Sequence, residues 1–163
     1  DAVADLTGQP ERPVGVMGMS IGATWAYVAA ARDHRIGALY DLGAAINSEA
    51  FQRVPFIIKS KVCQITGART NDEIRKVLAQ IKIDQPELLG RIGAAIRIVH
   101  GSKDRVVALA DKQWMSDELN RLGAASEVST RVFEGADHCC TGEIPEVRRD
   151  MAAFFTRVLG SRV

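Results

Sequence analysis

The sequence predicts an α/β fold built on a doubly wound, mainly parallel sheet. Short apolar runs typical of interior strands alternate with segments whose apolar residues recur at helical spacing. Polar loops that contain glycine follow several of these strands directly. With 163 residues, 47% of them hydrophobic and 25% charged, the chain is long enough for one domain with its own core.

The first unit is a strand, a sharp turn and a helix within about twenty residues. The run at 14–18 predicts a short buried strand that ends at a glycine. The alanine-rich segment 21–32 predicts a helix that packs closely on a sheet. A second apolar run at 36–40, which ends at Asp41, predicts the next strand. Together these segments form a βαβ unit.

The middle of the chain is less regular. We expect 44–61 to be loop with some helical pieces. Thr70 and Glu73 form the capping box of a helix over 70–81. Its apolar face consists of Ile74, Val77, Leu78 and Ile81. A short helical piece follows Pro86.

The last third returns to alternating strands and helices. We expect a strand at 95–99, a helix at 110–122, a strand at 129–133 and a final helix at 146–159. Gly123 is a favourable residue just past a helix end, and Pro145 just before a helix start. Apolar residues recur at helical intervals in the first of these helices: Trp114, Met115, Leu119 and Leu122. This order of elements favours a doubly wound sheet.

Charge and hydropathy exclude several classes of partner. The formal net charge is +1, from 21 Lys and Arg against 20 Asp and Glu scattered along the chain, so we expect no nucleic-acid partner. The longest apolar stretches fall far short of the ~20 residues needed to cross a bilayer. No charged and then apolar leader opens the sequence. We therefore expect a soluble, cytoplasmic protein that does not bind membranes.

The three cysteines do not suggest a disulfide framework. Their number is odd, and Cys139 and Cys140 are neighbours, so reduced thiols are expected for these two and Cys63. A zinc site next to His138 would need a second pair of ligands, and we expect no metal and no cofactor. Neither Cys139 nor Cys140 follows a strand-to-helix turn, so packing is the expected role of both.

The strongest chemical signal is Gly18-Met19-Ser20-Ile21-Gly22, a G-x-S-x-G between a predicted strand and a predicted helix. That context is typical of a nucleophile elbow. We expect Gly18 and Gly22 to be needed because larger side chains would clash beside the strained Ser20 turn. The Ile21 backbone N–H, at the positive end of the helix, is the expected oxyanion donor. The alternative is a turn that only packs a helix on a strand or binds a phosphate.

Two later loops carry the partners that such a serine needs. Asp104 follows the strand at 95–99, and His138 lies in the loop before the last helix, so both fall at the carboxyl ends of strands. Asp104 would fix the tautomer of His138 and stabilise its imidazolium. The order Ser20, Asp104, His138 favours a catalytic triad. Of the other histidines, His34 lies in a charged surface stretch, and we expect His100 to be buried and to brace the acid loop.

Other carboxylates compete for the role of the triad acid. Asp41, which follows the strand after the elbow, is the main rival. Asp137 is adjacent to His138 and badly placed to reach its ring. Asp104 itself could instead cap the following helix.

On the motifs GMSIG, HGSKDRVV and GADHCC, the chain resembles the α/β-hydrolase superfamily over nearly its whole length. The Asp-His-Cys-Cys run and the helical stretch before the acid strand resemble one group within it. That group includes the 2,6-dihydroxypseudooxynicotine hydrolases, the fungal polyketide-shortening hydrolases and the esterases similar to the fermentation-respiration switch protein. Its members typically hydrolyse a carbon–carbon bond next to a carbonyl. By this resemblance Ser20 attacks or polarises a ketone, and His138 protonates the departing carbon; ester hydrolysis would use the same residues.

The sequence departs from that family in one respect. In the family a loop after an early strand supplies the second oxyanion N–H, and no such strand precedes Val14. We therefore expect residues 1–163 to be the C-terminal portion of a single catalytic domain, without its N-terminal strands and helical domain. The alternatives are a partner chain or homodimer that completes the sheet, and a hydrolase outline without full activity. A small-molecule ester or ketone is the expected substrate; a non-catalytic binding module and an acyltransferase are the competing functions.

Overall fold

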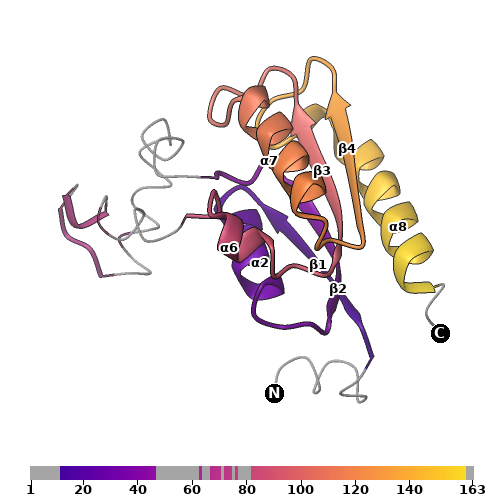
Figure 1. Cartoon of the computed structure of the whole chain (residues 1–163). Coiled ribbons are helices and arrows are strands. Elements are labelled where there is room, and N and C mark those ends of the chain that lie inside the picture. Colours follow the sequence, from indigo (N-terminus) through magenta and orange to yellow (C-terminus); the bar gives the residue numbers. More distant parts are fainter. Residues whose placement is uncertain are drawn as a thin grey trace.

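The structure, a computed structural model, describes residues 12–46, 63, 67–70, 72–74, 76 and 82–160. In this part of the chain, one sheet carries helices on both faces (Figure 1). The strands are β1 (Val14–Met19), β2 (Ile36–Leu42), β3 (Ala95–Gly101) and β4 (Glu127–Phe133). The helical elements are α2 (Ile21–Ala30), α6 (Pro86–Leu89), α7 (Leu109–Leu122), the 3-10 turn η1 (Thr141–Glu143) and α8 (Ile144–Gly160).

The sheet is parallel throughout its described strands. Its order is β1-β2-β3-β4, and every neighbouring pair runs in the same direction. The carboxyl ends of all four strands therefore lie along one edge, where loops can bring distant residues together. All seven residues of β2 are buried, as expected for a strand covered on both faces. The prediction of a doubly wound parallel sheet is confirmed.

One face of the sheet is covered by α2, α6 and α7. Alanines of α2 (Ala23, Ala26 and Ala30) are buried against it, which lets the helix backbone approach the strands closely. Tyr27, fully buried, supplies the volume that the alanines lack. Met115 and Leu119 of α7 complete this side of the core.

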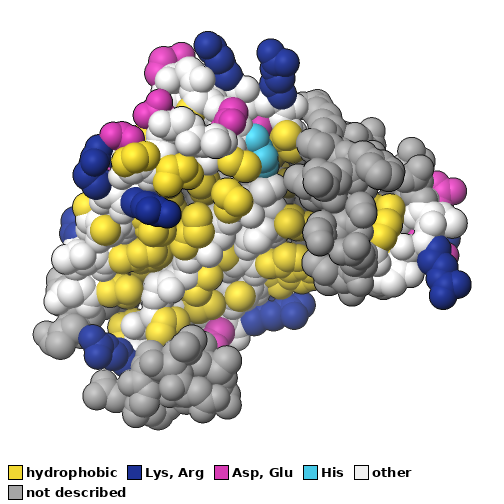
Figure 2. All heavy atoms as spheres, turned by 180° about the vertical axis from the view of Figure 1, so that it is seen from behind, with side chains coloured by type: hydrophobic (Ala, Val, Ile, Leu, Met, Phe, Trp, Pro, Cys, Tyr) yellow, Lys and Arg dark blue, Asp and Glu magenta, His cyan; other side chains and the backbone are white. Residues whose placement is uncertain are grey.

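The opposite face is covered by α8 alone among the described elements. Phe154 and Phe155 of α8 pack beside Tyr40 of β2, with ring centroids 6.2 Å and 6.3 Å from the tyrosine ring. Toward β1 this cover ends: Met17 and Met19 are 41% and 45% exposed. Figure 2 shows hydrophobic side chains gathered over much of the molecule's rear surface. Among the described residues, β1 pairs with β2 only.

Most predicted elements are present, with shifted ends. β2 continues to Leu42, β4 begins at Glu127, and α8 begins at Ile144 rather than after Pro145. The capping box is present: the Glu73 N–H donates to Thr70 Oγ1 at 3.2 Å, and the Thr70 N–H donates to Glu73 Oε2 at 3.2 Å. The predicted loop beyond residue 46 and the helix positions 77–81 lie outside the described residues.

Helix α7 differs from its predicted apolar face. Trp114 is 39% exposed, and the buried positions include Lys112, Met115 and Leu119. Residues 112, 115 and 119 share one side of a helix, and residue 114 lies about a quarter-turn away from 115. The helix ends as predicted, with Gly123 in the left-handed conformation at φ 63°. No described helix has the length and apolar character that crossing a membrane requires.

Candidate active site

Ser20 occupies the sharp turn between β1 and α2. Its backbone has φ 54° and ψ −126°, a conformation that costs a non-glycine residue roughly 1–3 kcal/mol. The surrounding backbone holds it there: the Ser20 N–H donates to the Leu42 carbonyl at 2.8 Å. The Ser20 carbonyl accepts from the N–H groups of Ala23 at 3.0 Å and Thr24 at 3.2 Å. The end of β2 and the first turn of α2 thus jointly fix the serine.

The two elbow glycines differ in their steric role. A Cβ on Gly18 would lie 2.3 Å from Ala23 Cα and 2.6 Å from the Gly22 carbonyl oxygen, so only glycine fits there. A Cβ on Gly22 would meet no described atom within 4 Å. The prediction of a steric requirement is therefore right for Gly18 and wrong for Gly22 in the described part of the chain. The reason is that Gly22 is exposed on the outer side of the first helical turn.

The structure brings Ser20, His138 and Asp104 together at the carboxyl edge of the sheet. His138 Nε2 lies 2.8 Å from Ser20 Oγ, and His138 Nδ1 lies 2.7 Å from Asp104 Oδ2. Because an ionised carboxylate only accepts, Nδ1 carries the proton and Nε2 is left to accept from the Ser20 hydroxyl. The His138 side chain is 12% exposed and that of Asp104 fully buried, so solvent reaches the imidazole but not the carboxylate.

The loop after β3 keeps Asp104 ionised. Burial alone would raise the pKa of this carboxyl, but hydrogen bonds from His138 and the backbone lower it below its ordinary value. Its Oδ1 accepts from the N–H groups of Val106 at 2.7 Å and Val107 at 3.0 Å. Asp104 therefore fixes the turn that follows it with one oxygen and holds His138 with the other. It does not cap the next helix, because α7 begins at Leu109 and its N-cap, Ala108, makes no side-chain hydrogen bond.

The loops that carry the acid and the histidine are joined to each other. A Cβ on Gly101, the last residue of β3, would lie 2.2 Å from the Asp137 carbonyl oxygen. The Lys103 N–H donates to the Ala136 carbonyl at 2.9 Å. The backbone beside Asp104 thus packs directly on the backbone that precedes His138.

His100 lies beneath the acid, as predicted for a residue that braces its loop. Its side chain is 2% exposed, and Nδ1 lies 3.6 Å from Asp104 Oδ2 without a hydrogen-bond partner among the described residues. Burial lowers the pKa of His100, which favours the neutral imidazole.

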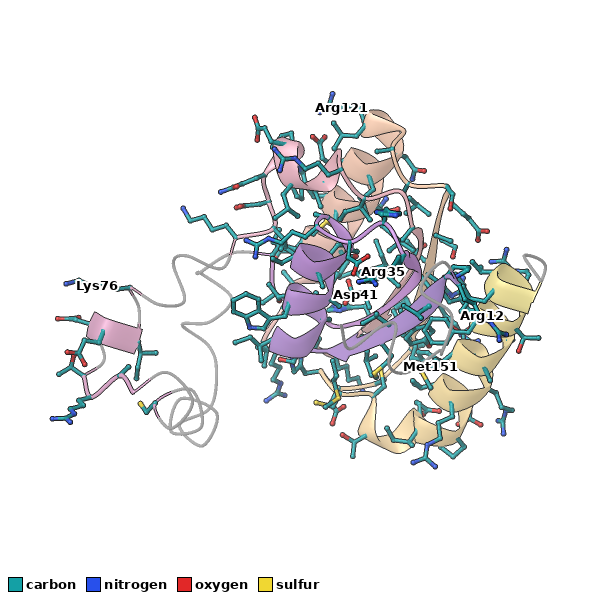
Figure 3. All side chains as sticks on the ribbon, turned by 90° about the horizontal axis from the view of Figure 1, so that it is seen from below. Arg12, Arg35, Asp41, Lys76, Arg121 and Met151 are labelled. Carbon is teal, nitrogen blue, oxygen red and sulfur yellow. The ribbon has the colours of Figure 1, made fainter. Side chains whose placement is uncertain are left out.

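The structure does not bring Asp41, the rival acid, to the histidine. Its carboxylate is fully buried and points to the α2 and α7 side of the sheet, where Oδ2 accepts from Lys112 Nζ at 2.8 Å and from the Tyr27 hydroxyl at 3.1 Å. Its Oδ1 accepts from the Ala44 N–H at 2.7 Å. Figure 3 shows Asp41 in the interior of the molecule, whereas Arg121 lies at its periphery. These contacts assign Asp41 to a buried ion pair and not to the triad.

Asp137 and the adjacent cysteines shape the histidine loop. Asp137 Oδ1 accepts from the N–H groups of Cys139 at 3.1 Å and Thr141 at 2.9 Å, so this carboxylate caps a turn. Cys140 is fully buried, and burial raises the pKa of its thiol to about 11. A thiol of that pKa is a poor nucleophile at neutral pH, in agreement with a packing role.

One residue at the site was not singled out from the sequence. Gly43, with φ 72°, follows β2 and lies against the imidazole: a Cβ there would be 3.3 Å from His138 Cε1 and 3.4 Å from His138 Nδ1. A glycine directly after a buried strand was the available signal. Ile21, the predicted oxyanion donor, is the first residue of α2, and a first helical N–H has no partner inside its own helix.

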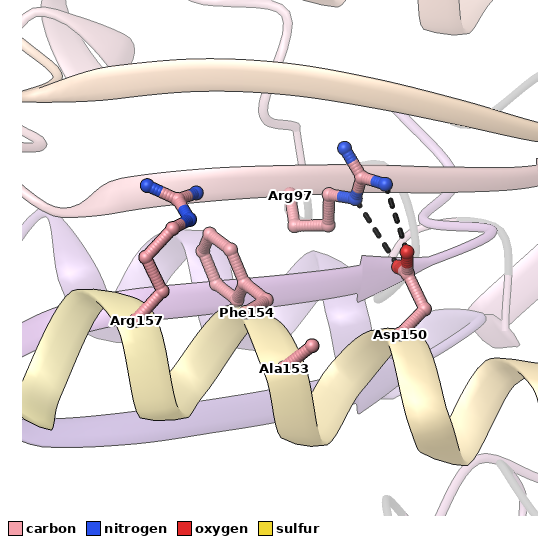
Figure 4. A pocket seen from close by; sticks show the side chains of 5 residues that line it. All are labelled: Arg97, Asp150, Ala153, Phe154 and Arg157. Carbon is pink, nitrogen blue, oxygen red and sulfur yellow. Dashed lines mark hydrogen bonds and ion pairs between the residues drawn. The ribbon is translucent and has the colours of Figure 1, made fainter.

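A pocket of about 210 Å³ lies on the α8 face, away from the serine (Figure 4). Arg97 pairs there with Asp150 at 2.8 Å, and Arg157 pairs with Glu127 at 2.6 Å. Its guanidinium groups are thus engaged by carboxylates of the same chain. Within the described residues, no three His, Cys, Asp or Glu side chains form a cluster suited to a metal ion.

No protein-family model and no curated protein sequence matches the chain. Among solved structures it is similar to the 2,6-dihydroxy-pseudo-oxynicotine hydrolase, with a TM-score of 0.76 and 24% identity over 97% of this chain and 44% of that one. For AbyA5 the TM-score is 0.81 and the identity 16%, over 98% of this chain and 45% of that one.

The esterase domain of a Rhodothermus marinus protein is also similar, with a TM-score of 0.69 and 13% identity over 97% of this chain and 66% of that one. The chain spans less than half the length of the first two structures. At these identities the likeness is one of fold.

Proposed function

Because the chain has part of the α/β-hydrolase fold, we propose that it is a serine hydrolase with Ser20, His138 and Asp104 as its catalytic triad. The observation that supports this proposal is the unbroken run of hydrogen bonds from the Ser20 hydroxyl through both ring nitrogens of His138 to Asp104. The strained backbone of Ser20 supports it further, because strain of this kind gathers at functional sites.

In the first half of the reaction, Ser20 Oγ attacks the substrate carbonyl while His138 Nε2 takes the hydroxyl proton. The imidazolium that forms is stabilised by Asp104, whose carboxylate stays ionised. Negative charge develops on the former carbonyl oxygen, close to the start of α2. The Ile21 N–H donates to this oxyanion, aided by the positive end of the helix dipole.

Collapse of the tetrahedral intermediate breaks the bond to the leaving group, which receives the proton from His138. Water then attacks the acyl group on Ser20, with His138 as the general base, and the serine is restored. The leaving atom is an oxygen in ester hydrolysis. In hydrolysis next to a ketone it is a carbon that departs with enolate character.

We propose a small-molecule ester or ketone as the substrate class. The sequence motifs resemble a group of carbon–carbon bond hydrolases, and structures of similar fold include both a 2,6-dihydroxy-pseudo-oxynicotine hydrolase and an esterase domain. Product analysis separates the two chemistries. A β-diketone that yields a carboxylic acid and a methyl ketone indicates carbon–carbon cleavage, and an acyl product that depends on an added alcohol indicates acyl transfer.

The test of the proposal is covalent labelling by a fluorophosphonate probe. We expect the parent protein to be labelled on Ser20 and the Ser20→Ala variant to stay unlabelled. Turnover of a p-nitrophenyl ester should fall by more than ~10³-fold in that variant. The matched control is Ser129→Ala, because Ser129 lies on β4 and its hydroxyl contacts the Ile96 carbonyl. A folded protein of full length that neither reacts with the probe nor hydrolyses the ester would contradict the proposal and favour a binding module.

We also propose that this chain is the C-terminal portion of a longer catalytic domain. The support is the exposure of Met17 and Met19 beside α8 and the pairing of β1 with β2 alone among the described residues. A sheet edge of this kind is normally covered in soluble proteins. A strand beside β1 would also bring a loop able to supply a second oxyanion N–H.

A further inference from the structure

A buried ion pair, formed by Asp41 and Lys112, lies near the carboxyl end of β2. The two side chains are 0% and 3% exposed and meet at 2.8 Å. The Tyr27 hydroxyl donates to the same carboxylate oxygen at 3.1 Å, so β2, α2 and α7 each contribute one member. Burial lowers the pKa of the Lys112 ammonium, and the Asp41 carboxylate opposes that effect.

Such a pair is a weak source of stability, because removing two charges from water costs about as much as their attraction returns. Its position at the end of β2 suggests that it fixes the turn that follows this strand. The second oxygen of Asp41 accepts from the Ala44 N–H at 2.7 Å and thereby closes the turn of residues 41–44. The ion pair fixes one carboxylate oxygen and leaves the other directed at this turn.

The same turn contacts two members of the proposed triad. The Leu42 carbonyl accepts the Ser20 N–H at 2.8 Å and so holds the strained elbow. Gly43 packs on the His138 imidazole, where a Cβ would lie 3.3 Å from Cε1. A change in the turn would therefore move both the backbone of Ser20 and the Gly43 backbone on which the His138 imidazole packs.

We propose that Asp41 is a positioning residue that sets the alignment of Ser20 with His138 through the 41–44 turn. This inference rests on the proposed serine hydrolase function. Asp41 acts through its hydrogen bond to the Ala44 N–H, and Lys112 compensates the charge of the buried carboxylate. Neither residue touches the substrate.

Two double variants separate the hydrogen bond from the charges. Asp41→Asn/Lys112→Met and Asp41→Ala/Lys112→Met both remove the ion pair, but only the first keeps a side-chain oxygen for the Ala44 N–H. The asparagine amide can also donate to the Tyr27 hydroxyl oxygen, so that group stays paired. The matched control is Asp150→Asn/Arg97→Met, which removes an ion pair from the α8 face of the sheet.

The readouts are kcat per active site, titrated by the fluorophosphonate probe, and KM for a p-nitrophenyl ester. For the asparagine variant we expect kcat within about threefold of the parent. For the alanine variant we expect a loss on the order of 10²-fold in kcat, as for a displaced catalytic group, with KM within about twofold. The control should keep the parental kcat. A purely structural role would lower the number of titrated sites and leave kcat per site unchanged.

A second readout does not depend on turnover. The proton between His138 Nδ1 and Asp104 gives a low-field proton NMR resonance, which we expect in the asparagine variant and expect to be shifted or broadened in the alanine variant. Equal kcat per site and equal resonances in the two variants would overturn the inference. An inactive parent with the expected difference in resonance would instead contradict the proposed function and leave the positioning role supported.

If both double variants fail to fold, Tyr27→Phe is the milder test. It removes only the hydroxyl that donates to Asp41. We expect a loss of about threefold to tenfold in kcat per site, corresponding to one weakened hydrogen bond. A parental kcat together with a parental His138 resonance would overturn the inference.

Discussion

The two faces of the sheet each carry a carboxylate that binds a tyrosine hydroxyl and a cation, yet the two clusters differ in their access to water. On the α2 and α7 face, Asp41 binds Tyr27 and Lys112, and both charged side chains are almost fully buried. On the α8 face, Asp150 accepts from the Tyr40 hydroxyl at 3.0 Å and pairs with two arginines. Those arginines, Arg97 and Arg131, are 21% and 41% exposed.

This difference shows that similar groups can serve different purposes. In the α8 cluster, water and the second arginine can still bind the Asp150 carboxylate when one arginine is lost. Each ion pair there therefore contributes modestly to the free energy of unfolding. In the buried cluster, Asp41 is the carboxylate that accepts from the cation among the described residues, and the loss of either charge leaves the other without this partner away from solvent. The buried cluster also lies at the end of β2, next to the turn that contacts Ser20 and His138.

The largest effect on stability should come from Lys112→Met. This change leaves the Asp41 carboxylate buried without its cation, so we expect the free energy of unfolding to fall by about 3–5 kcal/mol. Urea denaturation followed by circular dichroism measures it. Asp41→Asn/Lys112→Met should be clearly more stable than Lys112→Met alone. If Lys112→Met lowers the free energy of unfolding by less than about 1 kcal/mol, the buried cluster does not depend on its cation more than the α8 cluster does.

A smaller effect is expected from Asp150→Asn on the α8 face. The variant keeps an acceptor for the Tyr40 hydroxyl but loses the charge that binds Arg97 and Arg131, so we expect a loss of about 1–3 kcal/mol. The ester hydrolysis rate should not change, because Asp150 pairs with Arg97 of β3 and Arg131 of β4 and makes no contact with the proposed triad. A large loss of kcat in this variant would contradict the separation of roles.

The same variant has a predictable pH dependence. Burial raises the pKa of Asp150, but hydrogen bonds from Arg97, Arg131 and Tyr40 lower it below its ordinary value of 3.8. A lowered folded-state pKa stabilises the protein above the unfolded-state value, and this contribution disappears as the pH falls through the folded-state value. The stability difference between parent and variant should be constant from about pH 7 to 5 and shrink below about pH 4. A stability difference that grows toward low pH would mean that the folded-state pKa of Asp150 is raised, and would contradict this prediction.

The smallest effect should come from Glu127→Gln. The side chains of Glu127 and Arg157 meet at 2.6 Å but are 36% and 57% exposed, so we expect a loss of about 0.2–1 kcal/mol. Added salt should reduce even this difference, because it screens exposed charges. Denaturation at low and at about 0.5 M salt measures the effect.

The sequence was sufficient for the order of the elements and for the residues that meet at the carboxyl edge. Glycine-containing loops after apolar runs mark strand ends, and parallel strands bring such ends to one edge whatever their separation along the chain. That is why Ser20 and His138, separated by 118 positions, could be predicted to meet. Gly18 followed from the same local geometry, since the elbow crowds its own backbone.

The sequence was not sufficient for the partners of buried charges. Asp41 follows the predicted strand at 36–40 much as Asp104 follows the predicted strand at 95–99, but in the structure Asp41 lies within β2 and pairs with Lys112, 71 residues away. Lys112 was not singled out from the sequence, although it shares a helix side with Met115 and Leu119. Side-chain partners between elements depend on helix rotation and depth, which periodicity alone does not fix.

The close packing of the acid loop on the histidine loop has a practical consequence for protein engineering. Gly101 leaves no room between the two backbones, and Lys103 is bonded to Ala136 across them. A graft that replaces one loop with a longer one from a protein of similar fold would push the other loop aside, so both loops need to be transplanted together. The backbone of Ser20 is anchored at Leu42 and not in either of these loops. Substitutions near Leu42 can therefore change the distance between Ser20 Oγ and His138 Nε2 while both loops stay in place.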